Sequence, residues 1–331
     1  MIKCSVWLGL LIAGVAVGHT AENWRQVTKA DGLPGDEIQF LREDDSGTVW
    51  IGALSGLGAL RAGKFTNVVA RGEFWDLLQI GTDKFWVGAA NGALLISGAK
   101  QIWSLPGNTV APIIRFNATT VWALCKNRGT ERNTLMETTG QEWKPVARFE
   151  KEQVVDLLQT KDGTVWVAVD GNGVFSVGPV AVTQHLGGLN VTALREDSKG
   201  RVWCGLWGKG VAVWEKGAWT RHLPQEKSVI LSIREDSKGQ IWVATSANGL
   251  WRLTGETWIN DLAGEGAINL LESTSDGRVW ISSQSVGGLR YWDGAKWQVS
   301  LAKPLPIRCL LETKSKQILA GAILDGLYLR P

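Results

Sequence analysis

Several residue types are scarce in this 331-residue chain, and each scarcity excludes a class of protein. Proline occurs only 9 times and 44% of the residues are hydrophobic, so a disordered or collagen-like chain is excluded. Neither charge sign dominates, because 35 Lys and Arg oppose 32 Asp and Glu, and we predict no nucleic-acid partner. Histidine occurs 3 times, and neither a CxxC motif nor a histidine pair accompanies the 4 cysteines, so we predict no metal and no other cofactor.

Residues 1–21, MIKCSVWLGLLIAGVAVGHTA, have the layout of a secretory signal peptide. One lysine precedes an apolar run at 6–17, small residues follow, and cleavage is expected after Gly18 or Ala21. The run is shorter than the roughly 20 residues that a membrane-spanning helix needs, and no later segment could span. We therefore expect a bacterial protein that is periplasmic or secreted, lacks a membrane span and functions as a monomer, with 22–331 as its mature domain.

Three cysteines remain after removal of that peptide: Cys125, Cys204 and Cys309. They lie far apart at repeat positions, which favours small buried core residues. One disulfide with one free thiol is the alternative.

Tryptophan, by contrast, occurs 19 times and tyrosine only twice, and the tryptophans mark an internal repeat. The segments REDDSGTVWIG (42–52), REDSKGRVWCG (195–205) and REDSKGQIWVA (234–244) are near copies, and weaker copies fill the intervals. The register positions recur at intervals of 36 to 44 residues: Trp50, Trp86, Trp122, Trp166, Trp203, Trp242, Trp280 and Leu319.

Each unit contains four short apolar segments separated by Asp-Gly and Asn-Gly turns, which indicates four strands per repeat and an all-β propeller. The eighth unit ends after three such segments, whereas ENWRQV at 22–27 resembles an unpaired fourth strand centred on Trp24. Pairing of these two ends would complete the last blade and hide its edge. We predict a single eight-bladed β-propeller closed by the amino-terminal strand. Seven blades is the alternative, if the unit around Trp122 or Leu319 is absorbed differently.

Thirteen of the tryptophans recur at second-strand or fourth-strand positions, where each ring is expected to pack between neighbouring sheets while its indole N–H meets a carbonyl. Outside the signal peptide, five do not follow the repeat: Trp75, Trp207, Trp214, Trp251 and Trp292. Residues that depart from a repeat are the better functional candidates.

The segment GLPGDEIQFLREDDSGTVWIGALSGLGALR at 32–61 and its copies resemble the two-component regulator propeller repeat. The resemblance covers essentially the whole mature chain. It implies a periplasmic sensor-type propeller that binds a ligand or a protein, and relatives of this kind are often glycan-responsive. No kinase, regulator or membrane segment follows the propeller here, so we expect a stand-alone exported propeller.

Ligands of propellers usually meet the face that carries the fourth-to-first and second-to-third strand connections. Trp75, Asp76, Asp156 and Arg308 are predicted at the channel mouth on this face. Asp170, Trp207, Lys209, Asn248 and Asp325 are predicted in the second-to-third strand connections. Indole rings beside amides and carboxylates suit sugars, although Asn or Asp before Gly also serves tight turns. The long connection at 125–133 is predicted to be either a lid or a tolerated insertion.

Three functions follow from these residues. The first is a non-enzymatic binding propeller for a glycan or for an envelope or signalling protein. The second is a carboxylate-dependent glycan hydrolase or lyase that uses Asp76 and Asp156 as its acid and base. The third is a scaffold for an envelope assembly. A histidine base is disfavoured, because His185 and His222 are expected at the ends of outer strands. The repeated Arg42, Arg195 and Arg234 are expected to form structural ion pairs near the Asp turns.

Overall fold

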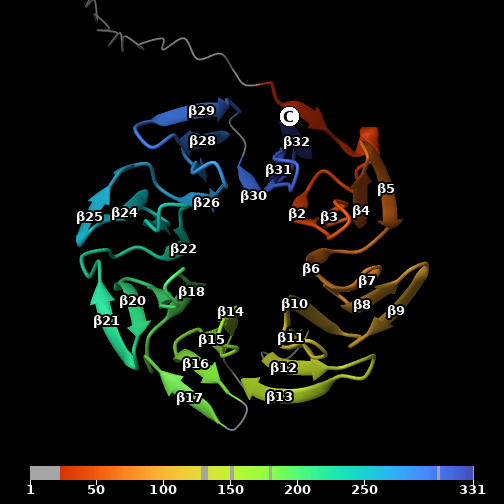
Figure 1. Ribbon diagram of the computed structural model, residues 1–331, viewed down its shortest axis with the longest axis horizontal. Coiled ribbons are helices and arrows are strands. Elements are labelled where there is room, and N and C mark those ends of the chain that lie inside the picture. The colour runs from red at the N-terminus through yellow and green to blue at the C-terminus, as the bar shows by residue number, and fades with distance from the viewer. Residues whose placement is uncertain (1–22, 128–132, 150–152, 179–180, 304–305, 331) are drawn as a thin grey trace, which may run out of the picture.

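The computed structural model describes residues 23–127, 133–149, 153–178, 181–303 and 306–330. The predicted signal peptide lies outside these residues. Eight four-stranded antiparallel sheets stand as blades around a central axis, which confirms the predicted eight-bladed propeller (Figure 1). Blades one to seven are formed by consecutive groups of four strands from β2 to β29, and blade eight by β30, β31, β32 and β1.

In blades one to seven the strands run outward from the axis in sequence order, and in blade eight β1 lies outside β32. The innermost strands are β2 (Ile38–Glu43), β6 (Phe74–Gly81), β10 (Asn108–Arg115), β14 (Val154–Gln159), β18 (Val191–Glu196), β22 (Ile230–Glu235), β26 (Ile268–Ser273) and β30 (Ile307–Glu312). The second strands are β3 (Val49–Ala53), β7 (Lys84–Ala89), β11 (Val121–Asn127), β15 (Val165–Val169), β19 (Val202–Leu206), β23 (Ile241–Thr245), β27 (Val279–Ser283) and β31 (Ile318–Ala322). The third strands are β4 (Gly56–Arg61), β8 (Gly92–Ser97), β12 (Asn133–Thr138), β16 (Gly173–Val177), β20 (Gly210–Glu215), β24 (Leu250–Thr254), β28 (Leu289–Trp292) and β32 (Leu327–Arg330). The outer strands are β5 (Lys64–Val69), β9 (Lys100–Ser104), β13 (Lys144–Phe149), β17 (Val182–His185), β21 (Ala218–His222), β25 (Thr257–Asn260), β29 (Trp297–Leu301) and β1 (Arg25–Val27).

The amino-terminal strand closes the ring as predicted. β1 pairs antiparallel with β32, with Arg25 opposite Leu329 and Val27 opposite Leu327. Trp24 lies just before this strand and donates its indole N–H to Ser300 Oγ in blade seven at 3.0 Å. A single 3-10 turn, η1 (Lys29–Asp31), then leads into blade one. None of the described residues forms a helix long and apolar enough to cross a membrane.

Tryptophans of the second strands pack between blades, and in four blades the indole N–H donates to a side-chain oxygen instead of the predicted carbonyl. The indole N–H of Trp122 in blade three is buried without a partner among the described residues. In three blades the acceptor is the carboxylate of the Asp that opens the preceding turn, six residues earlier. These pairs are Trp50 with Asp44 at 3.0 Å, Trp203 with Asp197 at 2.8 Å and Trp242 with Asp236 at 2.9 Å. In blade seven Thr274 Oγ1 accepts from Trp280 at 3.0 Å. The turn residue therefore fixes the ring that fills the space between the sheets.

Neighbouring blades are also joined across the face that carries these turns. In four places a glutamate at the end of one inner strand accepts the main-chain N–H of a turn residue in the preceding blade. The pairs are Glu196 with Lys161, Glu235 with Ser198, Glu312 with Ser275, and Glu43 with Lys314. The last pair joins blade eight to blade one and reinforces the closure.

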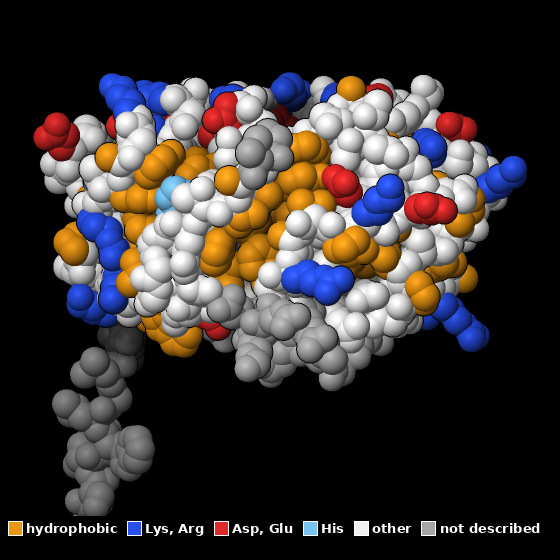
Figure 2. Space-filling model, turned by 90° about the horizontal axis from the view of Figure 1, so that it is seen from below, with side chains coloured by type: hydrophobic (Ala, Val, Ile, Leu, Met, Phe, Trp, Pro, Cys, Tyr) orange, Lys and Arg blue, Asp and Glu red, His pale blue; other side chains and the backbone are white. Residues whose placement is uncertain are grey.

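The rim of the ring carries apolar side chains where blades three and four meet. Figure 2 views this rim, which carries β13 and β17, and shows apolar side chains gathered in its middle. Phe149 and Phe175 pack edge-to-face here at 5.6 Å between ring centroids. Val182 on β17 is 51% exposed. The core between these two blades therefore extends to the molecular surface.

Candidate functional site

The starts of the inner strands and the second-to-third strand connections share one face of the ring. The register shows this directly, because Ile38, at the start of β2, lies opposite Ala53, at the end of β3. Fourth-to-first connections reach the same face. We call it the loop face, and it is the face on which the site residues were predicted.

Every inner strand carries a β-bulge at the same place near the loop face. The ladder with the second strand skips one residue in seven blades and two, Ala111 and Pro112, in blade three. We define the bulge ring as the residues Gln39, Trp75, Ala111, Val155, Thr192, Leu231, Asn269 and Arg308, in blade order from one to eight. Bulges commonly redirect a side chain next to a functional site. The other blades cover the faces of each inner strand, so exposed side chains of this ring face the axis.

Trp75 and Arg308 therefore belong to this ring, whereas the adjacent Asp76 and Asp156 are engaged elsewhere. Asp76 accepts the main-chain N–H of Leu77 at 2.9 Å and that of Ile113 in the next blade at 3.0 Å. We call this arrangement an Asp clasp, because one carboxylate joins two inner strands.

Asp156 forms the second Asp clasp. It accepts the N–H of Leu157 at 2.8 Å and that of Leu194 in the next blade at 2.8 Å. Burial raises the pKa of both Asp76 and Asp156, although their hydrogen bonds act in the opposite direction. The two carboxylates lie in different blades, and each is held by main-chain groups.

Three of the predicted residues in the second-to-third strand connections are open to solvent. Trp207 is 57% exposed, and Lys209 and Asp170 are exposed as well. Two further large apolar side chains project from connections of this type, Val286 in blade seven at 54% and Leu324 in blade eight at 71%. Three of the connections on the loop face thus present apolar side chains to solvent.

Asn248 and Asp325 hold connections in place. Asn248 Nδ2 donates to Glu226 at 2.9 Å, and the buried Glu226 also accepts from the indole of Trp251 at 2.8 Å. Burial by itself would raise the pKa of Glu226, but hydrogen bonds from Ser228, Asn248 and Trp251 lower it. Asp325 accepts from the hydroxyl of Tyr328, and its carboxylate lies 3.8 Å from Lys303 Nζ.

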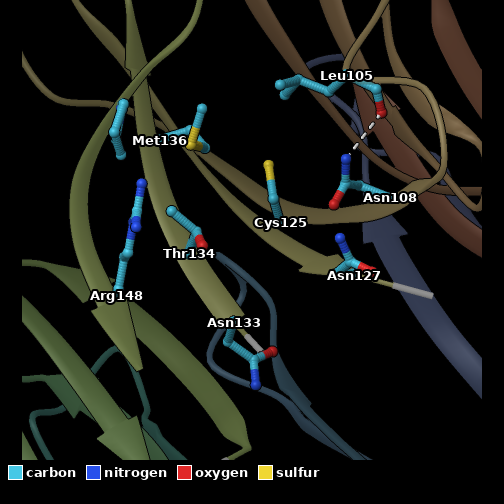
Figure 3. A pocket seen from close by; sticks show the side chains of 9 residues that line it. Leu105, Asn108, Cys125, Asn127, Asn133, Thr134, Met136 and Arg148 are labelled. Atoms are coloured by element: carbon cyan, nitrogen blue, oxygen red, sulfur yellow. Dashed lines mark hydrogen bonds between the residues drawn. The ribbon is translucent and has the colours of Figure 1, made fainter. Parts of the chain in front are cut away.

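Blade three contains a pocket that the sequence did not assign. Its volume is about 400 Å³, and it is lined by Leu105, Asn108, Cys125, Asn127, Asn133, Thr134, Met136, Pro145 and Arg148. Figure 3 shows these side chains, with Asn108 Nδ2 donating to the Leu105 carbonyl at 3.3 Å. Burial raises the pKa of Cys125 to about 12, so its thiol stays protonated and is a poor nucleophile at neutral pH. The 44-residue repeat interval was the available signal, because Cys125, Asn127 and Asn133, on the two strands that flank the long connection, line this pocket. Residues 128–132 of that connection, predicted as a lid or a tolerated insertion, lie outside the described residues.

The two histidines among the described residues, His185 and His222, lie beside tryptophans that pack between blades. His185 bonds Ser176 at 2.9 Å and packs against Trp166, and His222 packs against Trp203, which places both at the outer rim as expected. Burial lowers the pKa of both imidazoles. Among the described residues no group of three His, Cys, Asp or Glu could hold a metal ion.

The repeated arginines do not pair at the Asp turns. Arg42 reaches Asp76 at 3.3 Å and Arg234 reaches Glu272 at 2.8 Å, in each case an acid on the inner strand of the next blade. Two of the three arginines therefore join blades.

The cysteines carry no disulfide among the described residues. Cys125 and Cys204 are buried, as predicted, and Cys309 is partly buried. Burial raises the pKa of all three thiols.

Comparison with known proteins supports the same class of fold. Residues 223–247 match the family described as two component regulator propeller, which confirms the resemblance seen in the sequence. No curated protein matches the chain.

Solved β-propeller structures share the fold at low identity. The extracellular domain of a B. thetaiotaomicron protein, named as a hybrid two component system, is 14% identical with a TM-score of 0.57, over 94% of this chain and 53% of that one. Sqt1 of Saccharomyces cerevisiae is 10% identical with a TM-score of 0.69, over 89% and 96%. YCF48 bound to D1 peptide is 15% identical with a TM-score of 0.56, over 95% and 96%. This chain spans about half the length of the B. thetaiotaomicron domain, and identities this low establish the fold alone.

Proposed function

We propose that this protein is an exported, non-enzymatic binding propeller of the sensor type, periplasmic or secreted, which binds a glycan on its loop face. Trp207 carries the proposal. The repeat assigns thirteen tryptophans to blade packing, although one of them, Trp103 on an outer strand, is 47% exposed. Trp207 lies outside the repeat, on the loop face, and keeps 57% of its surface in solvent. An exposed indole suits the apolar face of a sugar ring, and the neighbouring Lys209 supplies hydrogen-bond donors for hydroxyl groups.

The family match and the shared fold of an extracellular sensor domain support this class of function. The Asp clasps favour a binding protein over a hydrolase, because the carboxylates of Asp76 and Asp156 each accept main-chain N–H groups from two blades. A general acid or base must instead present its carboxyl group to the substrate.

A glycan array followed by titration of intrinsic tryptophan fluorescence tests the proposal. Substitution Trp207→Ala should weaken binding of the selected oligosaccharide about tenfold, because loss of one stacked ring costs roughly 1 kcal/mol or more. Trp103→Ala is the matched control, since Trp103 is 47% exposed on the outer strand β9, and should bind as the parent protein does. Absence of any glycan response, or equal losses in both variants, would contradict the proposal.

A protein partner on the same face is the second candidate, and Val286 and Leu324 favour it. Exposed aliphatic side chains suit a protein surface better than a sugar. In this case a double variant, Val286→Ser with Leu324→Ser, should abolish capture of an envelope or signalling protein. The same variant should leave glycan binding unchanged.

A further inference from the structure

The bulge ring is divided into two arcs of different chemistry. Four consecutive blades, seven, eight, one and two, contribute side chains with hydrogen-bond donors: Asn269, Arg308, Gln39 and Trp75. The other four, blades three to six, contribute Ala111, Val155, Thr192 and Leu231. We call these sets the donor arc and the aliphatic arc. In Figure 1 their strands occupy opposite halves of the inner ring, with β26, β30, β2 and β6 on its upper-right side and β10, β14, β18 and β22 on its lower-left side.

The donors of the first arc lack acceptors among the described residues. Gln39 Nε2 and Trp75 Nε1 are shielded from solvent and have no hydrogen-bond partner there. Arg308 is exposed and forms no hydrogen bond or ion pair within the same part of the chain. The same shielded, unpaired state is found for the indoles of Trp122, Trp219, Trp258 and Trp297, so it does not distinguish this arc. Among these three donors, Arg308 is the one open to solvent.

The aliphatic arc exposes apolar side chains to solvent. Val155 is 44% exposed and Leu231 is 39% exposed, although both belong to innermost strands. The hydroxyl of Thr192, which lies between them in the ring, is engaged with the Ile230 carbonyl at 2.7 Å. An apolar group placed against this arc would remove aliphatic surface from water.

The donor arc contains one charged side chain, that of Arg308. Two carboxylates on the inner strands of these blades are occupied. Asp76 forms an Asp clasp and also meets Arg42 at 3.3 Å. Glu272, on the inner strand of blade seven, is held by both Arg234 Nε and Nη2. The guanidinium of Arg308 has no such counter-ion among the described side chains, so an anionic acceptor is preferred over a neutral one.

We propose that the bulge ring binds a carboxylate ligand with a compact aliphatic body. The carboxylate meets the exposed Arg308, and the aliphatic body lies against the exposed Val155 and Leu231. A free branched-chain acid and the carboxyl-terminal aliphatic residue of a peptide share this chemistry. The site is separate from Trp207 and does not depend on the proposed glycan-binding function.

Isothermal titration calorimetry on the whole protein tests the site with two matched pairs of probes. 4-Methylpentanoate is compared with 4-methylpentanamide, and N-acetyl-leucine with N-acetyl-leucinamide. Each acid should bind at least about tenfold tighter than its amide, because a charge-assisted hydrogen bond to a guanidinium is lost in the amide. Tighter binding of 4-methylpentanoate would indicate a free acid as the ligand, and tighter binding of N-acetyl-leucine would indicate a peptide terminus. Equal binding of acid and amide, or no binding of any probe, would overturn the proposal.

Variants then assign the two arcs. Arg308→Gln should remove the preference for acid over amide, whereas the control Arg221→Gln, an exposed arginine on the outer strand β21, should retain it. Leu231→Asn should weaken 4-methylpentanoate at least about fivefold while leaving acetate unchanged, since acetate lacks the aliphatic body. Circular dichroism verifies folding of each variant. Loss of preference in Arg221→Gln, or its persistence in Arg308→Gln, would contradict the assignment. Trp207→Ala should leave these affinities unchanged, which separates this site from the glycan site.

Discussion

At the residue scale, single carboxylates determine how the blades meet. Asp76 and Asp156 occupy the same position in blades two and four, and each joins main-chain N–H groups of two neighbouring inner strands. Such a group is hard to replace, because its loss leaves donors unpaired in both blades. The sequence marks these aspartates as departures from an apolar or small set, and the clasp gives that departure a structural reason.

Substitution Asp156→Ala should lower the free energy of unfolding by about 2 kcal/mol or more, since the N–H groups of Leu157 and Leu194 both lose their acceptor. Thermal and urea unfolding followed by circular dichroism measure this loss. Asp170→Ala in the same blade is the control and should change stability by less than about 0.5 kcal/mol, because its side chain is exposed. Equal stability of the two variants would show that the clasp contributes nothing.

At the element scale, the first-to-second strand turn is a folding unit of its own. In blade five Asp197 accepts from the main-chain N–H groups of Lys199 and Arg201, from the Arg201 guanidinium and from the indole of Trp203. Burial by itself would raise the pKa of Asp197, but these hydrogen bonds lower it. One carboxylate thus shapes the turn and orients the tryptophan that packs against the next blade.

The lowered pKa of Asp197 determines how its contribution to the free energy of unfolding changes with pH. An acid whose pKa is lower in the folded state contributes stability above its unfolded pKa, near 3.8, and loses that contribution as the pH falls through its folded value. Asp197→Asn should therefore be less stable than the parent by about 2 kcal/mol at pH 7. The difference should narrow as the pH falls below about 4. Unfolding curves at a series of pH values measure it, and the exposed turn residue Asp83, changed to Asn, is the control. A difference independent of pH would contradict the role of the ionised carboxylate.

At the scale of the whole molecule, the ring is stabilised by joining its two ends. β1 supplies the outer strand of blade eight, Val27 is fully buried, and Glu43 accepts from Lys314 across the same junction. Closure buries the edge of β32 and holds the inner strands at the spacing that forms the bulge ring.

Removal of residues 1–27 should leave β32 as an exposed edge, and a protein starting at Glu22 is the control. We expect a lower melting temperature and self-association of the shortened protein, because an unpaired edge strand is a template for another chain. Light scattering after size-exclusion chromatography and thermal unfolding test this. A monomer with unchanged stability would show that closure by β1 is dispensable.

The sequence by itself determined the all-β class, the strand order within a blade and the closing strand, and it favoured eight blades over seven, which the structure confirms. Those features follow from local patterns: strand length, turn residues and the repeated tryptophan, each of which acts within one unit of about forty residues. The hydrogen-bond partner of the indole could also have been predicted, because Asp44 and Trp50 are only six residues apart. A carbonyl was predicted instead, because the sequence does not show where a side chain points.

Only the tertiary structure decided which side chains meet between blades. Asp156 and Leu194 are about one repeat apart, and their contact depends on how rigid sheets are rotated around the axis. The structure likewise separated the exposed Trp207 from Asn248, which Glu226 holds in place, although both stand beside glycine in the sequence. Periodicity specifies each blade through local interactions, whereas the bulge ring and its two arcs arise from contacts that exist only after all eight blades have closed into a ring.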